Sequence, residues 1–386
     1  MTPRTAVVVG GGIGGLTAAG ALARQGWQVR LRERQPEIRA VGAGIYLWDN
    51  GLFALESIGA LAEAVEGAHK APEMEMRTRS GRTLVRVKIN GAGQPRCVTP
   101  PRTQLMKALV NAATAAGVEI VTDSPVHAVR PDGDVHLDHG QIESADLVVV
   151  ADGVHSRLRD SVDLAYTRTR MSQGGARIMI PRSAHYLSAA DGHKHLESFH
   201  GSRRLLCTPC TPRDLYLAFT CDSDDPGIDG SHIDVAEWTR SFPAFAKVLA
   251  ATEGVPMIRW DTYEHVRLCS WSRGRVAFIG DAAHAQPPYL GQGGGTAMTN
   301  AIALATAVSR PTASLFDALA GWECRTRPGI ERTQNTSYRM RLLNRVPDVV
   351  RDPLIRLAGL LPSTANSQLA ATRIRPNLTT DDEDAK

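Results

Sequence analysis

The sequence contains no long apolar run and few aromatic residues. Its longest apolar runs, such as residues 147–151, have the length of a strand and fall far short of the ~20 residues that a helix needs to cross a bilayer. Glycines interrupt the apolar stretch near the N-terminus after a few residues, so it lacks the apolar core of a signal peptide. We therefore expect no membrane partner.

Clustered cysteines and clustered basic residues are also missing. Six cysteines are scattered along the chain without the spacing of a disulfide framework, which favours the reducing cytoplasm. Cys207 and Cys210 form a CxxC pair, but no second pair accompanies them, so we prefer a strand and its turn over a zinc or redox site. The net charge is +4 without a dense run of Lys and Arg, which argues against nucleic acid as a partner.

The composition is otherwise that of a folded globular protein with more than one domain. Apolar residues make up 43% of the chain and charged residues 22%, and 386 residues are too many for one compact core. Residues 6–9 form a short apolar run, residues 16–23 have helical periodicity, and residues 29–33 form the next strand-like run. This order predicts a strand, a glycine turn, a helix and a parallel strand.

Further along the chain, the patterns predict two interleaved domains. Helical spacing recurs over 52–65 and 105–116, and a strand follows at 118–121. Short β-rich runs dominate from about 171 to 260, and a strand of the first type returns at 275–279. We expect a first domain from residues 1–70, 99–165 and 265–314, a β-rich substrate domain from residues 71–98 and 166–264, C-terminal helices over 315–375, and an acidic tail over 376–386.

A glycine-rich turn joins the first strand to the first helix. It reads Gly10-Gly-Gly12-Ile13-Gly14-Gly15, and its place between a strand and a helix makes it a dinucleotide-binding fingerprint. Gly10 would allow the tight turn, Gly12 would let a pyrophosphate approach the backbone, and Gly15 would let helix and strand pack closely. The N-terminus of the helix would offer free N–H groups to the phosphates.

Glu33 supports nucleotide binding, and two further motifs decide which cofactor is meant. Glu33 ends the second strand, where it would accept hydrogen bonds from an adenosine ribose; taken alone, it would be an exposed strand-end carboxylate. Ala151-Asp152-Gly153-Val-His-Ser-Arg-Leu-Arg159 follows an apolar strand, and Gly280-Asp281-Ala-Ala-His284 leads into Pro288-Tyr-Leu-Gly-Gln-Gly-Gly. In this order and at these separations, the motifs resemble the flavoprotein aromatic hydroxylase family, which has the para-hydroxybenzoate hydroxylase fold.

The resemblance covers roughly residues 4–330 and implies the cofactor FAD. It also implies an α/β fold with a Rossmann-like FAD-binding domain, an inserted β-rich substrate domain and a C-terminal helical segment. Asp281 would bind the ribityl chain, Pro288 would lie beside the flavin ring, Val126 would meet the adenine, and Arg102, if not a surface arginine, would reach the cofactor. The expected FAD-binding residues are Gly10, Gly12, Ile13, Gly14, Gly15, Glu33, Arg34, Gly44, Arg102, Val126, Asp152, Asp281, Pro288, Gly291, Gly293 and Gly294.

The family pattern has two less certain points in this chain. Asp152 and Arg159 would brace the pyrophosphate region and the nicotinamide approach. A helix starting near Thr296 would direct its dipole at the negative charge of reduced flavin. Where most members have Asp in this helix, the chain has Asn300, which removes a charge and leaves that contact open.

Residues 39–52 and several β-rich runs resemble the branch of 2-methyl-3-hydroxypyridine-5-carboxylate oxygenase, a ring-opening member, more than the phenol hydroxylases. Tyr46, Arg177, Arg204 and Tyr216 would then line the substrate pocket as its catalytic polar residues. Arg204 would hold a carboxylate or phenolate, and Tyr216 would orient a ring hydroxyl. Each could instead be a structural residue, and Arg203 beside Arg204 leaves the strand register open.

The resemblance implies a monooxygenase that uses NADH or NADPH and O2. The reduced flavin would form a hydroperoxide, and its distal oxygen would be transferred to a small electron-rich aromatic or hydroxypyridine-type ring, with or without ring opening. No metal-ligand or Ser-His-Asp arrangement competes with this reading. The alternatives are hydroxylation of a larger secondary metabolite, or a flavin-dependent isomerase or cyclase without net oxygen use. Either a monomer or a homo-oligomer fits the sequence.

Overall fold

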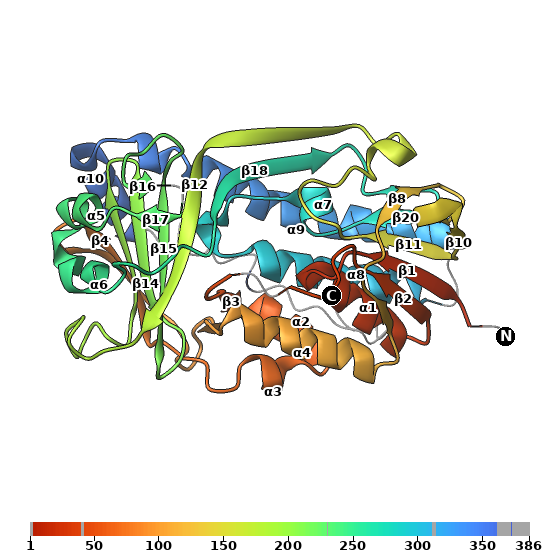
Figure 1. Cartoon of the computed structure of the whole chain (residues 1–386), viewed down its shortest axis with the longest axis horizontal. Coiled ribbons are helices and arrows are strands. Elements are labelled where there is room, and N and C mark those ends of the chain that lie inside the picture. Colours follow the sequence, from red (N-terminus) through yellow and green to blue (C-terminus); the bar gives the residue numbers. More distant parts are fainter. Residues whose placement is uncertain (1–2, 40–41, 230, 311–313, 361–371, 373–386) are drawn as a thin grey trace.

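The structure is a computed structural model that describes residues 3–39, 42–229, 231–310, 314–360 and 372. One end of the molecule is built on a six-stranded sheet (Figure 1). Its strands are β1 (Thr5–Val9), β2 (Gln28–Arg32), β7 (Glu119–Val121), β11 (Leu147–Val150), β19 (Ser272–Arg273) and β20 (Val276–Phe278). The spatial order is β19-β20-β11-β1-β2-β7, and all neighbours are parallel except β19 and β20. The predicted strand, turn, helix and parallel strand is therefore confirmed.

Helices and a small sheet complete the core of this end. The helix α1 packs against α4 and α8, and its Leu16 and Leu22 are fully buried. Val129 and Val135 of the small antiparallel sheet join the same apolar cluster. The elements are α1 (Ile13–Arg24), α2 (Asp49–Ser57), α3 (Leu61–Ala64), α4 (Arg102–Ala115), α7 (Asp281–His284), α8 (Gly293–Val308), β3 (Leu47–Trp48), β6 (Cys97–Val98), β8 (Val126–Val129), β9 (Asp134–Leu137) and β10 (Ile142–Ser144).

The other end of the molecule is a seven-stranded sheet, to which two separate parts of the chain contribute (Figure 1). Its order is β18-β12-β15-β14-β13-β4-β5, and only β13 and β4 run parallel. Its elements are β4 (Glu73–Thr78), β5 (Thr83–Lys88), β12 (Tyr166–Pro181), β13 (His195–His200), β14 (Arg203–Pro209), β15 (Asp214–Asp222) and β18 (Trp260–Leu268), accompanied by β16 (Ile228–Asp229), β17 (His232–Ile233), α5 (Val235–Ser241) and α6 (Ala246–Ala250).

The register of this sheet separates its two faces. Ile178, Leu205 and Leu217 lie on one face, in an apolar cluster with residues of α5 and α6. Side chains alternate along a strand, so the neighbours of these residues point to the opposite face. There Arg204 pairs in register with Thr220, whereas Arg203 lies on the first face and binds Asp225 at 2.6 Å. The open question of the register at Arg203 and Arg204 is thereby answered.

Two strands, β12 and β18, extend from the seven-stranded sheet toward the end of the molecule that holds the six-stranded sheet (Figure 1). β12 is 16 residues long; residues 173–181 pair with β15, and residues 166–170 pair only with β18. The far part of β18 reaches the loop after α7, where the Val266 N–H donates to the Ala285 carbonyl at 3.1 Å. The two strands therefore connect the two ends of the molecule by backbone pairing with each other, with one irregularity between Arg170 and Gly174, and by the contact with Ala285.

Some predicted helices have different bounds in the structure. The single helix expected over 52–65 is two helices, α2 and α3, because Gly59 takes a positive φ of 74° between them. The helix expected to start near Thr296 begins at Gly293. The C-terminal helical prediction is met by α9 (Leu315–Met340) and α10 (Asp348–Leu360), whereas the acidic tail lies outside the described residues. No described helix is long and apolar enough to cross a membrane.

The helix α10 covers the end of the seven-stranded sheet with one of its faces. Ile355 is buried there, and Arg351 donates a hydrogen bond of 2.7 Å to the Gly201 carbonyl. Val349 and Leu360, by contrast, are 83% and 78% exposed. The outward face of α10 is therefore apolar and uncovered within the described chain.

A buried hydrogen-bond network joins α7, α8 and α9. Trp322 Nε1 donates to the Asn300 Oδ1 at 2.9 Å, and the Asn300 Nδ2 lies 2.9 Å from His284 Nε2. Because an indole can only donate, the amide oxygen must face Trp322 and the amide N–H must donate to His284. His284 is thus neutral, with its proton on Nδ1, and burial lowers its pKa to about 4.

We expect Asn300→Asp to weaken the acid sensitivity of the fold. In the parent protein, His284 is protonated below pH 6.5 in the unfolded chain but only near pH 4 in the folded chain. The free energy of unfolding therefore decreases as the pH falls through this interval, by about 2 kcal/mol at pH 5. A carboxylate at position 300 would favour the imidazolium and raise the pKa of His284. Urea unfolding at pH 8 and pH 5 measures the difference. Asn335→Asp on α9 is the control, and equal pH sensitivity of the two variants would contradict the network.

Candidate active site

The glycine-rich turn leaves an open space at the N-terminus of α1. Gly10 has a φ of +106°, and a Cβ there would lie 2.6 Å from the Ala151 carbonyl oxygen. A Cβ on Gly15 would lie 1.9 Å from the Gly10 oxygen, so helix and strand approach more closely than any side chain allows. Gly12 has no atom within 4 Å on its open side. The turn therefore has the shape that a pyrophosphate on the helix N-terminus requires.

Glu33 lies beside this turn at the end of β2. Its carboxylate accepts the Gly11 N–H at 2.7 Å and the Gln35 N–H at 2.9 Å. Each oxygen retains a second acceptor position, so a ribose could still donate to it. The Ser124 N–H donates to the Glu33 carbonyl at 2.9 Å, which brings the chain leading to Val126 to this edge, and the neighbouring Arg34 is exposed.

Arg159 holds two of the sequence motifs together. Its guanidinium is 1% exposed, and its Nε donates to the Ala282 carbonyl at 2.7 Å. The other nitrogens donate to carbonyl oxygens of the Asp152 loop and to that of Asp281. One buried oxygen of Asp152, Oδ1, has no partner among the described residues. These contacts join the Asp152 loop to α7, whereas the brace between the pyrophosphate region and the nicotinamide approach that the resemblance implies stays a prediction.

Asp281 is exposed and borders an open space, which is called the hollow below. Desolvation raises its pKa, and the nearby charges of Arg102 and Arg159 oppose this shift. The side chain nevertheless keeps accessible surface, so it borders space rather than packed protein. Arg102 reaches the same region, since its charge acts on Asp281. A Cβ on Gly42 would lie 2.7 Å from the Cδ of Arg102, so the arginine side chain packs closely against this glycine. A deep carboxylate beside an open space fits the hydroxyl groups of a flavin side chain.

The N-terminus of α8 meets the same hollow. Gly291 has a φ of +61°, which a side chain would disfavour, and Gly293 has no atom within 4 Å on its open side. A Cβ on Gly294 would lie 3.1 Å from Ile45 and 3.6 Å from Ile13, so α8 and the first glycine turn converge. The exposed Pro288 precedes this segment. Two helix N-termini, those of α1 and α8, thus border one space, which suits an anionic cofactor.

The substrate face of the seven-stranded sheet lies close to this segment. Gly44 packs so tightly that a Cβ would lie 2.8 Å from the Tyr216 ring, and Tyr46 contacts Gly291. Tyr46 forms a short hydrogen bond with Thr208. Desolvation raises the pKa of Tyr216, with the Arg177 guanidinium beside its hydroxyl. Tyr46, Arg177 and Tyr216 are therefore brought together, as the sequence predicts.

Both arginines of this face have acidic partners within the protein. Arg177 Nη1 lies 2.9 Å from Asp261 Oδ2. Arg204 forms a close ion pair with Glu197, in which both side chains are 7% exposed, and its Nη2 donates to the Tyr289 carbonyl at 3.1 Å. The role of Arg204 as a substrate ligand stays a prediction, but these contacts favour a link between the sheet and the turn at residues 288–290.

The sequence analysis missed Tyr263 and Glu197. Tyr263 is buried, and its hydroxyl forms a hydrogen bond of 2.8 Å with the Thr220 hydroxyl. It adds a third phenol to those of Tyr46 and Tyr216 on this face. It fits only because Gly175 has no side chain, since a Cβ there would lie 2.2 Å from the Tyr263 hydroxyl. Two consecutive glycines inside a strand, at 174–175, were the available signal of such a close approach. Glu197 gave no signal, since its partner depends on strand order.

The CxxC pair does not form a reactive site. Both thiols are buried and free, on opposite faces of the sheet: Cys207 lies in the cluster with α5 and α6, and Cys210 packs beside Tyr216. Burial raises the pKa of Cys207 to about 12 and raises that of Cys210 further. Thiols are nucleophilic or bind metal as thiolates, so both are inert at neutral pH.

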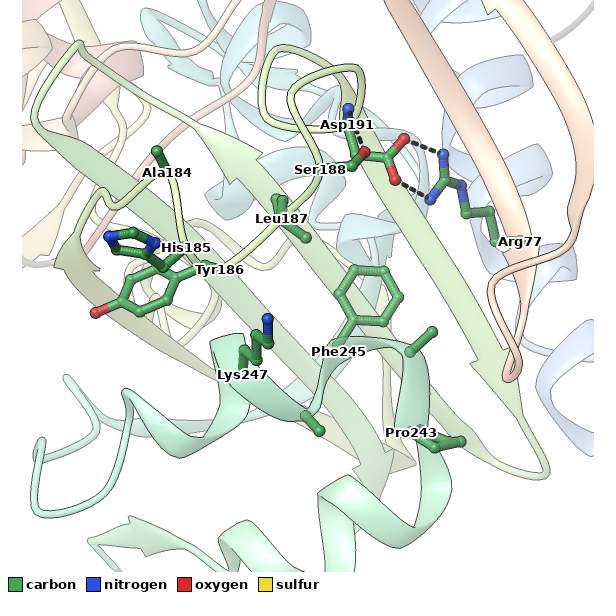
Figure 2. Close-up of a pocket in the computed structure, with 12 residues that line it drawn as sticks. Arg77, Ala184, His185, Tyr186, Leu187, Ser188, Asp191, Pro243, Phe245 and Lys247 are labelled. Atoms are coloured by element: carbon green, nitrogen blue, oxygen red, sulfur yellow. Dashed lines mark hydrogen bonds and ion pairs between the residues drawn. The ribbon is translucent and has the colours of Figure 1, made fainter.

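Another open hollow lies away from this site, on the opposite face of the seven-stranded sheet (Figure 2). It has a volume of about 610 Å³ between the loop at residues 184–191 and the segment at residues 243–247. Leu187 and Phe245 line it, and an ion pair of Arg77 with Asp191 forms one wall. Since none of the motif residues borders it, its size does not make it the site of the chemistry.

Comparison with known proteins agrees with the geometry. Residues 4–314 match the family model described as FAD binding domain. A probable 2-heptyl-3-hydroxy-4(1H)-quinolone synthase of Rhodococcus erythropolis is 70% identical over 98% of each chain. A 2-heptyl-3-hydroxy-4(1H)-quinolone synthase of Mycobacteroides abscessus is 52% identical over 97% of this chain and 99% of the other.

A solved structure shows the same fold. The tetrameric form of 2-methyl-3-hydroxypyridine-5-carboxylic acid oxygenase superposes with a TM-score of 0.87 at 36% identity, over 97% of this chain and 98% of that chain. The predicted resemblance and fold class are therefore confirmed. The chain belongs to the FAD binding domain family, and it is an FAD-dependent aromatic-ring monooxygenase that takes its electrons from NAD(P)H.

Proposed function

We propose that this enzyme hydroxylates carbon 3 of a 2-alkyl-4(1H)-quinolone. The two relatives at 70% and 52% identity carry the name of an enzyme that forms 2-heptyl-3-hydroxy-4(1H)-quinolone. The reaction would insert one oxygen atom of O2 into the bond between carbon 3 and hydrogen, and NAD(P)H would reduce the other atom to water. A quinolone is a pyridone ring fused to benzene, so it is larger than the hydroxypyridine expected first and belongs with the secondary metabolites named as the alternative.

The paired state of the two arginines is the observation that carries this choice. Arg204 and Glu197 neutralise each other in a buried ion pair, and Arg177 is paired with Asp261 at 2.9 Å. A substrate carboxylate would have to compete with these acids, and it would add a negative charge to a site whose cations are already compensated. A neutral quinolone meets no such cost. The site thus suits a neutral ring better than a hydroxypyridine carboxylate.

The residues around the hollow fit FAD. Gly12 and the N-terminus of α1 would hold the pyrophosphate, Glu33 the ribose, and Asp281 the ribityl chain, while Pro288 would lie against the ring. Bound FAD supplies the two-electron chemistry with NAD(P)H and the activation of O2. The protein itself has to orient the substrate and exclude water from the reacting atoms.

The phenols of the substrate face would share this work unequally. Tyr46 and Tyr263 are engaged by Thr208 and Thr220. Among the described residues, the Arg177 guanidinium hydrogen-bonds to the Tyr216 hydroxyl, and because a guanidinium can only donate, the phenol proton would be available for the ring carbonyl of a quinolone. Burial keeps this phenol protonated by raising its pKa. Tyr216 would therefore fix which carbon faces the flavin, and Arg204 would position the 288–290 turn.

Location and assembly follow as parts of the same proposal. All six cysteines are free, which suits the reducing cytoplasm. The tetrameric oxygenase with the same fold and the uncovered apolar face of α10 favour a homo-oligomer over a monomer.

We expect the purified yellow protein to consume O2 with 2-heptyl-4(1H)-quinolone and NADH or NADPH. The product should be heavier than the substrate by one oxygen atom, as mass spectrometry would show, because hydroxylation leaves both rings closed. The comparison substrate is 2-methyl-3-hydroxypyridine-5-carboxylate, which should give no product. Turnover of the carboxylate alone, or NAD(P)H oxidation that yields only peroxide with the quinolone, would refute the proposal.

Asp281→Ala should lose FAD during purification. The variant lacks a charge-assisted hydrogen bond of roughly 1.5–3 kcal/mol, which corresponds to a binding constant about 10 to 100 times weaker. The ratio of flavin to protein absorbance after gel filtration measures the loss. Asp224→Ala, at an exposed position, is the matched control and should stay yellow. A fully loaded Asp281→Ala protein would remove this residue from the cofactor site.

Tyr216→Phe should retain FAD but use NAD(P)H wastefully. Without the hydroxyl donor, the substrate is held less firmly, so we expect a KM about tenfold higher and more peroxide per product. Peroxide and product are quantified in the same reaction. Tyr186→Phe removes a hydroxyl from the opposite face of the sheet and serves as the control. Equal coupling in the two variants would show that Tyr216 does not orient the substrate.

A further inference from the structure

A small second pocket lies behind the 288–290 turn. It has a volume of about 180 Å³, and residues from β12 and from the end of α9 and the chain after it line it. This volume is about six times the ~30 Å³ that one water occupies in the liquid, so a group of several non-hydrogen atoms fits into the pocket. The lining residues are Thr169, Arg170, Met171, Ser172, Gln173, Tyr338, Arg341 and Arg345.

Three arginines of this pocket have only neutral partners in the described part of the chain. Arg345 Nη2 donates to Ser172 Oγ at 2.8 Å, and Arg341 Nη1 donates to the Tyr338 carbonyl at 2.8 Å. Arg170 lies 3.4 Å from Thr262 Oγ1. Other arginines of this sheet, such as Arg177, Arg203 and Arg204, are bound to carboxylates, so three arginines together without such a partner form a local excess of positive charge.

The acids near the pocket do not cancel this charge. Glu264 is on the strand next to Arg170, but it is already bound to Arg168 in a bidentate pair. Asp222 lies opposite Gln173 in the sheet register and forms no ion pair with the three arginines among the described residues. One carboxylate against three guanidinium groups leaves a net positive site.

Gln173 supplies an unused hydrogen-bond donor at the same place. The residue is 1% exposed, and its Nε2 has no partner in the described structure. Its Oε1 is fully engaged, because it accepts a short hydrogen bond from the Tyr289 hydroxyl and a second, at 3.4 Å, from Asn344 Nδ2. A buried amide N–H without an acceptor is costly, and this one lines the pocket, so an acceptor bound there would satisfy it.

We propose that this pocket binds a phosphate group, with the three arginines and the Gln173 amide as its donors. Phosphate carries several acceptor oxygens and up to two negative charges. The guanidinium groups and the amide are planar donors whose N–H directions are fixed. The chemistry fits two sources, a phosphate of NAD(P)H and free inorganic phosphate. The proposal requires only the family's use of NAD(P)H and does not depend on the quinolone.

The pocket is connected to the flavin side of the protein through one side chain. Gln173 binds the Tyr289 hydroxyl, and Tyr289 is part of the turn that begins at Pro288. Arg204 holds the same turn from the sheet through the Tyr289 carbonyl, at 3.1 Å. A phosphate that fixes Gln173 therefore also fixes the turn beside the expected flavin ring.

The test uses the FAD-loaded enzyme and the double variant Arg341→Gln/Arg345→Gln. The control, Arg332→Gln/Arg339→Gln, removes the same charge from exposed positions of α9 outside the pocket. Two readouts are measured for each protein: the Tm in increasing inorganic phosphate at constant ionic strength, and the KM for NADH and for NADPH.

For the parent and the control, we expect a saturable rise of Tm with phosphate, which the pocket variant loses. A KM for NAD(P)H at least tenfold higher in the pocket variant alone would identify the nucleotide as the source of the phosphate. An unchanged KM with loss of the Tm response would identify free phosphate. The absence of a saturable response in the parent, or equal behaviour of the two double variants, would overturn the proposal.

Gln173→Glu provides a second test that keeps the size of the side chain. It places a carboxylate where the amide N–H would meet phosphate, so the Tm response should disappear although Arg341 and Arg345 remain. A Gln173→Glu protein with an undiminished response to phosphate would likewise contradict the proposal.

Discussion

The buried guanidinium of Arg159 is the contact on which the architecture of the site depends. It binds carbonyl oxygens of two loops, one after β11 and one at the start of α7, which are over 120 residues apart in the chain. A lysine could not replace it, because only the planar fork reaches several carbonyls at once. The loops carry Asp152 and Asp281 and follow the paired strands β11 and β20, so this side chain and the strand pairing together hold their spacing.

Charge compensation separates the substrate face from the rest of the molecule. Arg177 and Arg204 are each paired with an acid, so the wall of the substrate site is polar but close to neutral. In contrast, Arg170, Arg341 and Arg345 on the far side of the 288–290 turn have no acid partner in the described chain. The same kind of residue therefore prepares one surface for a neutral ring and another for an anion, and the difference lies entirely in which neighbours the fold provides.

The sequence was sufficient for features that are local in the chain. The turn at Gly10–Gly15, the position of Glu33 and the parallel strands follow from patterns within about 30 residues, and the structure has them. The pairing of Arg204 with Glu197 could not be predicted, because the two residues become neighbours only when β13 and β14 pair. The contact of Tyr263 with Thr220 likewise depends on the order β18-β12-β15. At position 300, the chain has Asn where the family pattern has Asp, so the sequence indicated a changed contact. The partner of Asn300, Trp322, could not be predicted, because it lies on a helix whose packing the sequence does not specify.

The long strand β12 and its partner β18 give the molecule a mechanical property as well as a shape. A hinge between the two ends would have to bend this pair of strands, which is hydrogen-bonded on both sides of the irregularity between Arg170 and Gly174. The arrangement also separates two tasks: the side chains on the open face of the seven-stranded sheet shape the expected substrate site, while the paired strands β12 and β18 connect that face to the cofactor side.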